Sequence, residues 1–75
     1  MHDRLPVVYT IRGCDACVKL MEQWSQAGIA YEEKRVELSQ ATLDEARRYG
    51  SMVPIVVWPD GGVDVGFENR LGCFI

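Results

Sequence analysis

The pattern of apolar and polar positions predicts a strand followed by an amphipathic helix in the first third of the chain. Residues 6–10 form a continuous apolar run, which is typical of a central strand covered on both faces. Across residues 15–27 apolar side chains recur at helical spacing, and Gly28 follows as a helix stop signal. We therefore expect a helix to begin directly after a buried strand and a short turn.

Residues 30–38 predict a second strand, because β-favouring residues there are interleaved with charged side chains that suit an exposed sheet edge. Thr42 and Glu45 match a capping box, in which a hydroxyl and a carboxylate satisfy the first N–H groups of a helix. That second helix is expected to end at Gly50.

The remaining chain predicts a β-hairpin followed by a terminal stub. Residues 53–58 are rich in β-branched side chains, and residues 63–67 alternate apolar positions with Asp64 and Gly66. Pro and Gly in residues 59–62 supply the turn between them. The last residues, 68–75, leave room for a short C-terminal helix. The expected class is α/β, with element order β-α-β-α-β-β and a four-stranded mixed sheet.

Length and composition predict one soluble domain over residues 1–75. The chain is 48% hydrophobic and 25% charged, as in globular proteins. A net charge of −3 argues against a nucleic acid partner, and no apolar run approaches the ~20 residues of a membrane span. No signal peptide is recognisable before the first strand. We therefore expect a monomeric, cytoplasmic protein with no membrane association.

Cys14 and Cys17 stand where the first strand turns into the first helix. Unpaired N–H groups and the positive end of the helix dipole favour a thiolate at this position. Cys17 falls on the same helical stripe as Leu20 and Trp24, so we expect it to face the core while Cys14 stays at the exposed tip. These positions predict that Cys14 attacks a substrate disulfide and that Cys17 then attacks the resulting mixed disulfide at Cys14. A Cys-x-x-Cys motif that directly follows a strand and begins a helix is typical of a redox site.

A metal site is the main alternative for these cysteines, since Cys73 and His2 would complete a set of four ligands. The two additional ligands lie at opposite ends of the chain, so we expect no metal. Cys73 is then interpreted as a small apolar residue that packs the last segment. A non-catalytic module that binds a peptide or a metal in the same groove is the alternative from a different functional class.

From Val7 to the C-terminus the chain resembles the glutaredoxin family of the thioredoxin-like fold, on the following segments. Residues 8–17 are similar to its strand–CxxC–helix segment, including the Gly before the first cysteine. Val53 and Pro54 stand where the family has a Val-Pro pair with a cis peptide bond, and Gly66-Phe67 resembles the glycine-containing end of its last strand. Element order and length are also similar.

This resemblance implies a thiol–disulfide oxidoreductase whose co-substrate is glutathione and which holds no cofactor permanently. Pro54 would be cis and close to Cys14, which leaves the main chain of Val53 free to pair with an extended substrate. Gly66 would allow close approach of the backbone. The N–H groups of Phe67 and Glu68 would hold a carboxylate of the γ-glutamyl end.

The resemblance also implies that either Glu68 or Asn69 lies near the ammonium group of glutathione. Arg12 is the candidate for a glutathione carboxylate, although it stands one residue beyond the family's position. The family often has Lys or Arg three residues before the first cysteine, where this chain has Ile11. A glutaredoxin-like redoxin subgroup, which takes electrons from thioredoxin reductase and serves ribonucleotide reductase, shares the Gly-Phe ending. Glutathione and thioredoxin reductase thus both remain open as reductants, with disulfide-containing proteins as partners.

Overall fold

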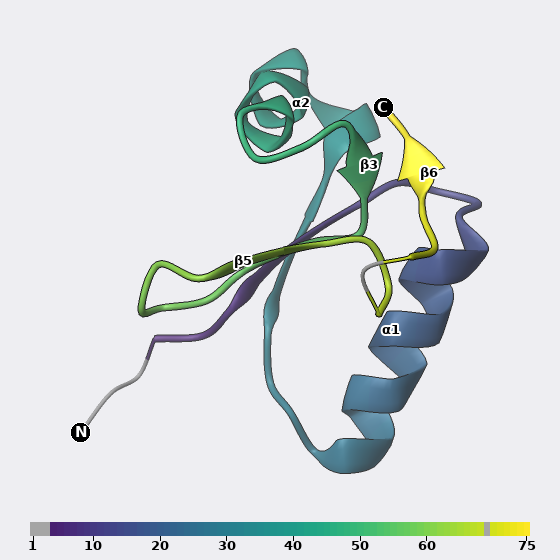
Figure 1. Cartoon of the computed structure of the whole chain (residues 1–75), viewed down its shortest axis with the longest axis vertical. Coiled ribbons are helices and arrows are strands. Elements are labelled where there is room, and N and C mark those ends of the chain that lie inside the picture. The colour runs from purple at the N-terminus through teal and green to yellow at the C-terminus, as the bar shows by residue number, and fades with distance from the viewer. Residues whose placement is uncertain (1–3, 69) are drawn as a thin grey trace.

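The computed structural model describes residues 4–68 and 70–75. Strands and helices alternate as far as α2, and four short strands then follow one another to the C-terminus (Figure 1). In chain order the elements are β1 (Val7–Thr10), α1 (Asp15–Ala27), β2 (Glu32–Arg35), a 3-10 turn (Val36–Leu38), α2 (Gln40–Arg47), β3 (Met52–Val53), β4 (Ile55–Val57), β5 (Val63–Val65) and β6 (Cys73–Phe74).

The main sheet has four strands in the order β2-β1-β4-β5. Strand β1 lies parallel to β2, with Val8 opposite Glu33, and antiparallel to β4, with Val8 opposite Val56. Strands β4 and β5 form the expected hairpin, with Ile55 opposite Val65. The prediction of a four-stranded mixed sheet with a charged edge strand is confirmed, although β2 is shorter than residues 30–38 and continues into the 3-10 turn.

The two helices cover opposite faces of this sheet. Val8 is packed in one buried cluster with Leu20 and Trp24 of α1. Its neighbour Tyr9 belongs to the other cluster, together with Ala46 of α2 and with Ala16 and Cys17 from the first turn of α1. Because successive side chains of a strand point to opposite faces, the two clusters lie on the two sides of β1. The strand is therefore covered on both faces, as its continuous apolar run predicts.

The helix ends follow local backbone chemistry. Gly28 caps α1 in the left-handed region at φ 74°, as expected for a glycine after the last helical residue. Helix α2 begins earlier than predicted, because the Ser39 hydroxyl, and not Thr42, is the capping group: Ser39 Oγ accepts a hydrogen bond from the N–H of Thr42. The prediction of a capping box at Thr42 and Glu45 is therefore wrong. The last residue of α2 is Arg47, so the helix also ends earlier than the predicted stop at Gly50.

The C-terminal segment forms a strand, and the predicted terminal helix is wrong. Strand β6 pairs antiparallel with β3, which places Cys73 opposite Val53 and Phe74 opposite Met52 (Figure 1). The predicted strand at residues 53–58 is interrupted at Pro54, so that β3 leaves the main sheet and forms this separate pair. Phe74 is 81% exposed while Cys73 is half-buried, the alternation of a strand with one covered face.

Candidate functional site at the start of helix α1

Cys14 is the N-cap residue of α1, as the sequence predicted. Its backbone is extended, at φ −98° and ψ 113°, and its carbonyl oxygen accepts a hydrogen bond from the N–H of Val18 at 3.1 Å. Gly13, at φ 79°, makes the turn that leads from β1 into the helix. The sulfur therefore lies at the helix end where N–H groups have no helical partners and the dipole is positive.

A disulfide joins Cys14 to Cys73 in β6, with their Cα atoms 6.1 Å apart. Cys14 is only 1% exposed, so the expectation of an exposed tip is wrong. The interpretation of Cys73 as simple packing is also wrong, because the pairing of β6 with β3 brings its sulfur directly onto Cys14. The strand that replaces the predicted terminal helix thus covers the sulfur and binds it covalently.

Cys17 is the free cysteine and faces the interior, as its helical phase predicted. It is 1% exposed and packs in the buried cluster that includes Tyr9 and Val36. Burial raises the pKa of the Cys17 thiol; the backbone N–H of Ile11 opposes this shift, and the carboxylate of Glu33 adds to it. Cys17 is therefore a thiol, not a thiolate, near neutral pH.

Val53 and Pro54 lie beside this cysteine pair, and the bond between them is cis, as predicted. Val53 is fully buried, and its carbonyl oxygen lies 4.0 Å from Cys14 Sγ. The expectation that the main chain of Val53 is free for a substrate is wrong in this structure, because Cys73 pairs with it. The chain's own C-terminal segment occupies the edge that the sequence assigned to a substrate peptide.

Gly66, Phe67 and Glu68 form a tight turn near the end of the hairpin. The N–H of Gly66 donates to the Pro54 carbonyl oxygen at 2.7 Å, and a Cβ added to Gly66 would lie 3.1 Å from the Leu71 carbonyl oxygen. The N–H of Phe67 donates to that same oxygen of Leu71 at 2.6 Å, so this N–H is not available for the predicted carboxylate. Asn69 lies outside the described residues.

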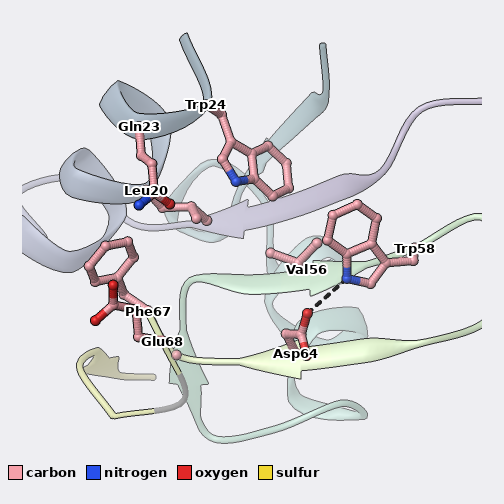
Figure 2. A pocket seen from close by; sticks show the side chains of 9 residues that line it. Leu20, Gln23, Trp24, Val56, Trp58, Asp64, Phe67 and Glu68 are labelled. Atoms are coloured by element: carbon pink, nitrogen blue, oxygen red, sulfur yellow. Dashed lines mark hydrogen bonds between the residues drawn. The ribbon is translucent and has the colours of Figure 1, made fainter. Parts of the chain in front are cut away.

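The side chains of Phe67 and Glu68 line a hollow of about 230 Å³ between α1 and the β4–β5 hairpin (Figure 2). Trp58 Nε1 donates a hydrogen bond to Asp64 Oδ2 at 2.8 Å, and the Trp58 ring lies 5.5 Å from that of Trp24. The carboxylates of Asp64 and Glu68 make the mouth of this aromatic hollow acidic. Such a surface suits a cationic group better than an anionic one.

A second hollow, of about 300 Å³, lies directly beside the disulfide. It is lined by the start of α1 and by the segment that leads into β6: Gly13, Asp15, Ala16, Lys19, Leu71, Gly72 and Cys73. Cys73 is half-buried and lines this hollow, whereas Cys14 is 1% exposed and is not among the residues that line it. Arg12 lines neither of the two hollows. Its main-chain N–H donates a hydrogen bond to Glu37 Oε1 at 3.4 Å.

Among the described residues, no group of three or more His, Cys, Asp or Glu side chains is placed to hold a metal ion, and His2 lies outside them. No helix within residues 4–68 and 70–75 is long and apolar enough to cross a bilayer. Comparison of the chain with models of known protein families, with curated proteins and with solved structures gave no match.

The sequence reading missed Gly72 and Cys73 as parts of the site. A signal was present in the last five residues, where Leu71, Cys73 and Ile75 alternate with Gly72 and Phe74. Short apolar runs of this kind cannot be assigned to strand or helix by periodicity alone.

Proposed function

We propose that this chain is a thiol–disulfide oxidoreductase with a thioredoxin-like fold of the glutaredoxin type, in which Cys14 and Cys17 are the working pair. The observation that carries the proposal is a juxtaposition: Cys14 begins α1 with its sulfur 4.0 Å from the Val53 carbonyl oxygen, and Cys17 lies one turn later on the core side. A helix N-terminus stabilises the thiolate, which is the form that attacks disulfides.

In the proposed cycle the Cys14 thiolate attacks one sulfur of a substrate disulfide R–S–S–R′. A Cys14–R disulfide forms, and R′ leaves as a thiolate that takes up a proton. The Cys17 thiolate then attacks Cys14 Sγ, so that a Cys14–Cys17 disulfide forms and R leaves as a thiolate. Two electrons pass from the cysteine pair to the substrate, and two glutathione molecules restore the pair as they become glutathione disulfide.

The Cys14–Cys73 form enters this cycle by internal exchange. Attack of the Cys17 thiolate on Cys14 Sγ breaks the bond to Cys73, which leaves as a thiolate and gains a proton. The oxidised chain then carries the Cys14–Cys17 disulfide that glutathione reduces. The Cys14–Cys73 and Cys14–Cys17 disulfide forms have the same oxidation state, so the exchange needs no external oxidant or reductant. No cofactor is held permanently in this scheme.

The residues proposed to receive glutathione surround the cysteine pair. The main chain of Val53 would pair with its cysteinyl part once β6 moves away, with Pro54 and Gly66 fixing the backbone around it. The acidic hollow beside Phe67 and Glu68 offers a carboxylate to its ammonium group (Figure 2). The proposed contact runs to the side chain of Glu68, since the N–H of Phe67 is already engaged.

A coupled assay tests this function. Reduced protein is given a mixed disulfide of glutathione and a peptide, and NADPH oxidation is followed with glutathione and glutathione reductase or, separately, with thioredoxin reductase. Turnover should occur with glutathione and be lost in Cys14→Ser, while Ser25→Ala, on the exposed side of α1, keeps it. Turnover only with thioredoxin reductase would favour the redoxin alternative. Equal turnover in Cys14→Ser would overturn the proposal.

A non-catalytic module with a structural disulfide is the second candidate, and the 1% exposure of Cys14 favours it. The two candidates differ in how easily the Cys14–Cys73 bond is exchanged. A structural disulfide resists the glutathione pool, whereas a catalytic one is opened by it. Millimolar glutathione should therefore release Cys73 within minutes under the proposed function, as measured by alkylation and mass spectrometry.

A further inference from the structure

The C-terminal segment from Gly72 to Ile75 lies on β3 as an extended peptide. Cys73 and Phe74 pair antiparallel with Val53 and Met52, and the N–H of Ile75 donates to the Ser51 carbonyl oxygen at 2.9 Å. Its cysteine is bonded to Cys14. The segment therefore has the geometry of a peptide that has added a strand to the edge beside a reactive cysteine and formed a mixed disulfide with it.

Gly72, immediately before this cysteine, has no room for a side chain. A Cβ built on Gly72 would overlap Met52 Cγ, and it would lie 2.6 Å from the Val53 carbonyl oxygen and 2.8 Å from Met52 Sδ. The Met52 side chain is flexible and can move aside. The Val53 oxygen cannot, because it belongs to a fully buried main chain that is fixed between Met52 and Pro54. The β3 edge thus excludes a branched carbon at the position before the cysteine.

We propose that the β3 edge binds extended cysteine peptides antiparallel to Met52–Val53, that it requires glycine directly before the cysteine, and that residues 72–75 are an internal copy of such a peptide. This inference rests on the proposed function and adds a substrate class to it. Glutathione meets the same requirement, since its γ-glutamyl link places an unbranched methylene carbon before the cysteine. Peptide and glutathione thus share one chemistry: an unbranched carbon preceding the cysteinyl amide.

The C-terminal segment would then compete with external peptides for the β3 edge. While Cys73 is bonded to Cys14, no other peptide can use the edge of β3, because β6 already pairs with it. Exchange with Cys17 frees Cys73, after which the segment is held by its main-chain pairing and by the packing of Cys73 and Ile75 against the core. An external peptide must then displace a segment that is tethered to the same chain.

The test uses the full chain with Cys17→Ala and Cys73→Ser, which leaves Cys14 as its single cysteine. Two peptides, Leu-Gly-Cys-Phe-Ile and Leu-Ala-Cys-Phe-Ile, are prepared as pyridyl disulfides, and the release of thiopyridone is timed. Attack by Cys14 forms the protein–peptide disulfide as thiopyridone leaves. The chain's own segment competes equally with both peptides, so the ratio of the two rates reports only on the residue before the cysteine.

We expect the glycine peptide to react about tenfold faster or more, as a close contact with the main chain requires. Equal rates would overturn the inference. A small pyridyl disulfide of cysteamine separates the two proposals: if it reacts with Cys14 and the peptides react alike, only the substrate class is wrong. If Cys14 reacts with none of the three, the proposed function itself fails.

A second measurement keeps the three cysteines and therefore does not depend on the double variant. The oxidised chain is equilibrated in a glutathione buffer, and its Cys14–Cys73 and Cys14–Cys17 forms are counted by peptide mapping. Gly72→Ala should lower the share of the Cys14–Cys73 form about tenfold relative to the other. Gly62→Ala, in the hairpin turn, is the matched control, with its nearest contact at 3.2 Å. An unchanged ratio in Gly72→Ala would contradict the inference.

Discussion

The carbonyl oxygen of Val53 lies 4.0 Å from the sulfur of Cys14, across 39 residues of sequence. This contact joins the start of α1 to the edge of β3, and β6 closes over it from the other side. An extended peptide whose sulfur reaches Cys14 would therefore lie along the main chain of Val53.

Alkylation should distinguish the three cysteines. In the oxidised chain Cys14 and Cys73 are blocked and Cys17 is buried, so rapid labelling should be absent at all three. In the reduced Cys73→Ser variant, Cys14 should label on the order of tenfold faster than Cys17. The helix end favours the Cys14 thiolate and β6 is no longer bonded over its sulfur, whereas burial raises the pKa of the Cys17 thiol. Mass spectrometry of iodoacetamide adducts over time measures both rates, and faster labelling of Cys17 would contradict the assigned roles.

The exchange from Cys14–Cys73 to Cys14–Cys17 should accelerate with pH. The attacking group is the Cys17 thiolate, and burial raises the pKa of this thiol, so its thiolate is scarce at pH 7. Below that pKa the thiolate fraction, and hence the rate, should rise about tenfold per pH unit, and the rise should continue beyond the pKa of a free cysteine. Acid-quenched peptide mapping measures the rate; a plateau already at pH 7 would argue against a buried attacking thiol.

Ile55 should contribute strongly to the stability of the sheet. It is fully buried in the cluster between β1, β4 and α2. Ile55→Ala should lower the free energy of unfolding by about 2–5 kcal/mol, since the substitution leaves a cavity that neighbours fill only in part. Val63→Ala, on the adjacent strand but 40% exposed, should cost far less. Urea denaturation measures both, and equal losses would place the core elsewhere.

Ser39 should stabilise helix α2 more than Thr42 does. The Ser39 hydroxyl accepts the N–H of Thr42, whereas no cap function falls to the Thr42 side chain. Ser39→Ala should therefore cost about 1 kcal/mol and Thr42→Ala clearly less. Thermal unfolding followed by circular dichroism checks this order. The reverse order would favour the capping box that the sequence pattern suggested.

The four strands of the main sheet and the first helix could be predicted in outline from sequence, because each carries its own local signal. The apolar run through Val8 specifies a covered strand, and the stripe that contains Cys17 and Trp24 fixes which side of α1 faces the core. Gly28 marks the end of that helix. These features depend on periodicity and on backbone preferences, which a single chain displays directly.

The pairing of Cys73 with Cys14 could not be predicted, because it depends on contacts between distant segments. The last residues are too few to show a period, and their strand exists only because β3 leaves the main sheet at Pro54 and offers them an edge. Likewise, the engagement of the Phe67 N–H follows from a turn that returns the chain to Leu71. Such tertiary contacts override the secondary structure that the local sequence pattern predicts.

The Cys14–Cys73 bond encloses most of the chain in one covalent ring, because its two cysteines are 59 residues apart. A loop of that length lowers the entropy of the unfolded chain enough to stabilise the folded state by about 4 kcal/mol. For so small a domain this is a large share of the total stability. Resistance to proteolysis and to mechanical pulling on the chain ends should thus depend on the redox state of its surroundings, so that the same bond would report the thiol balance of a compartment as a change in protein lifetime.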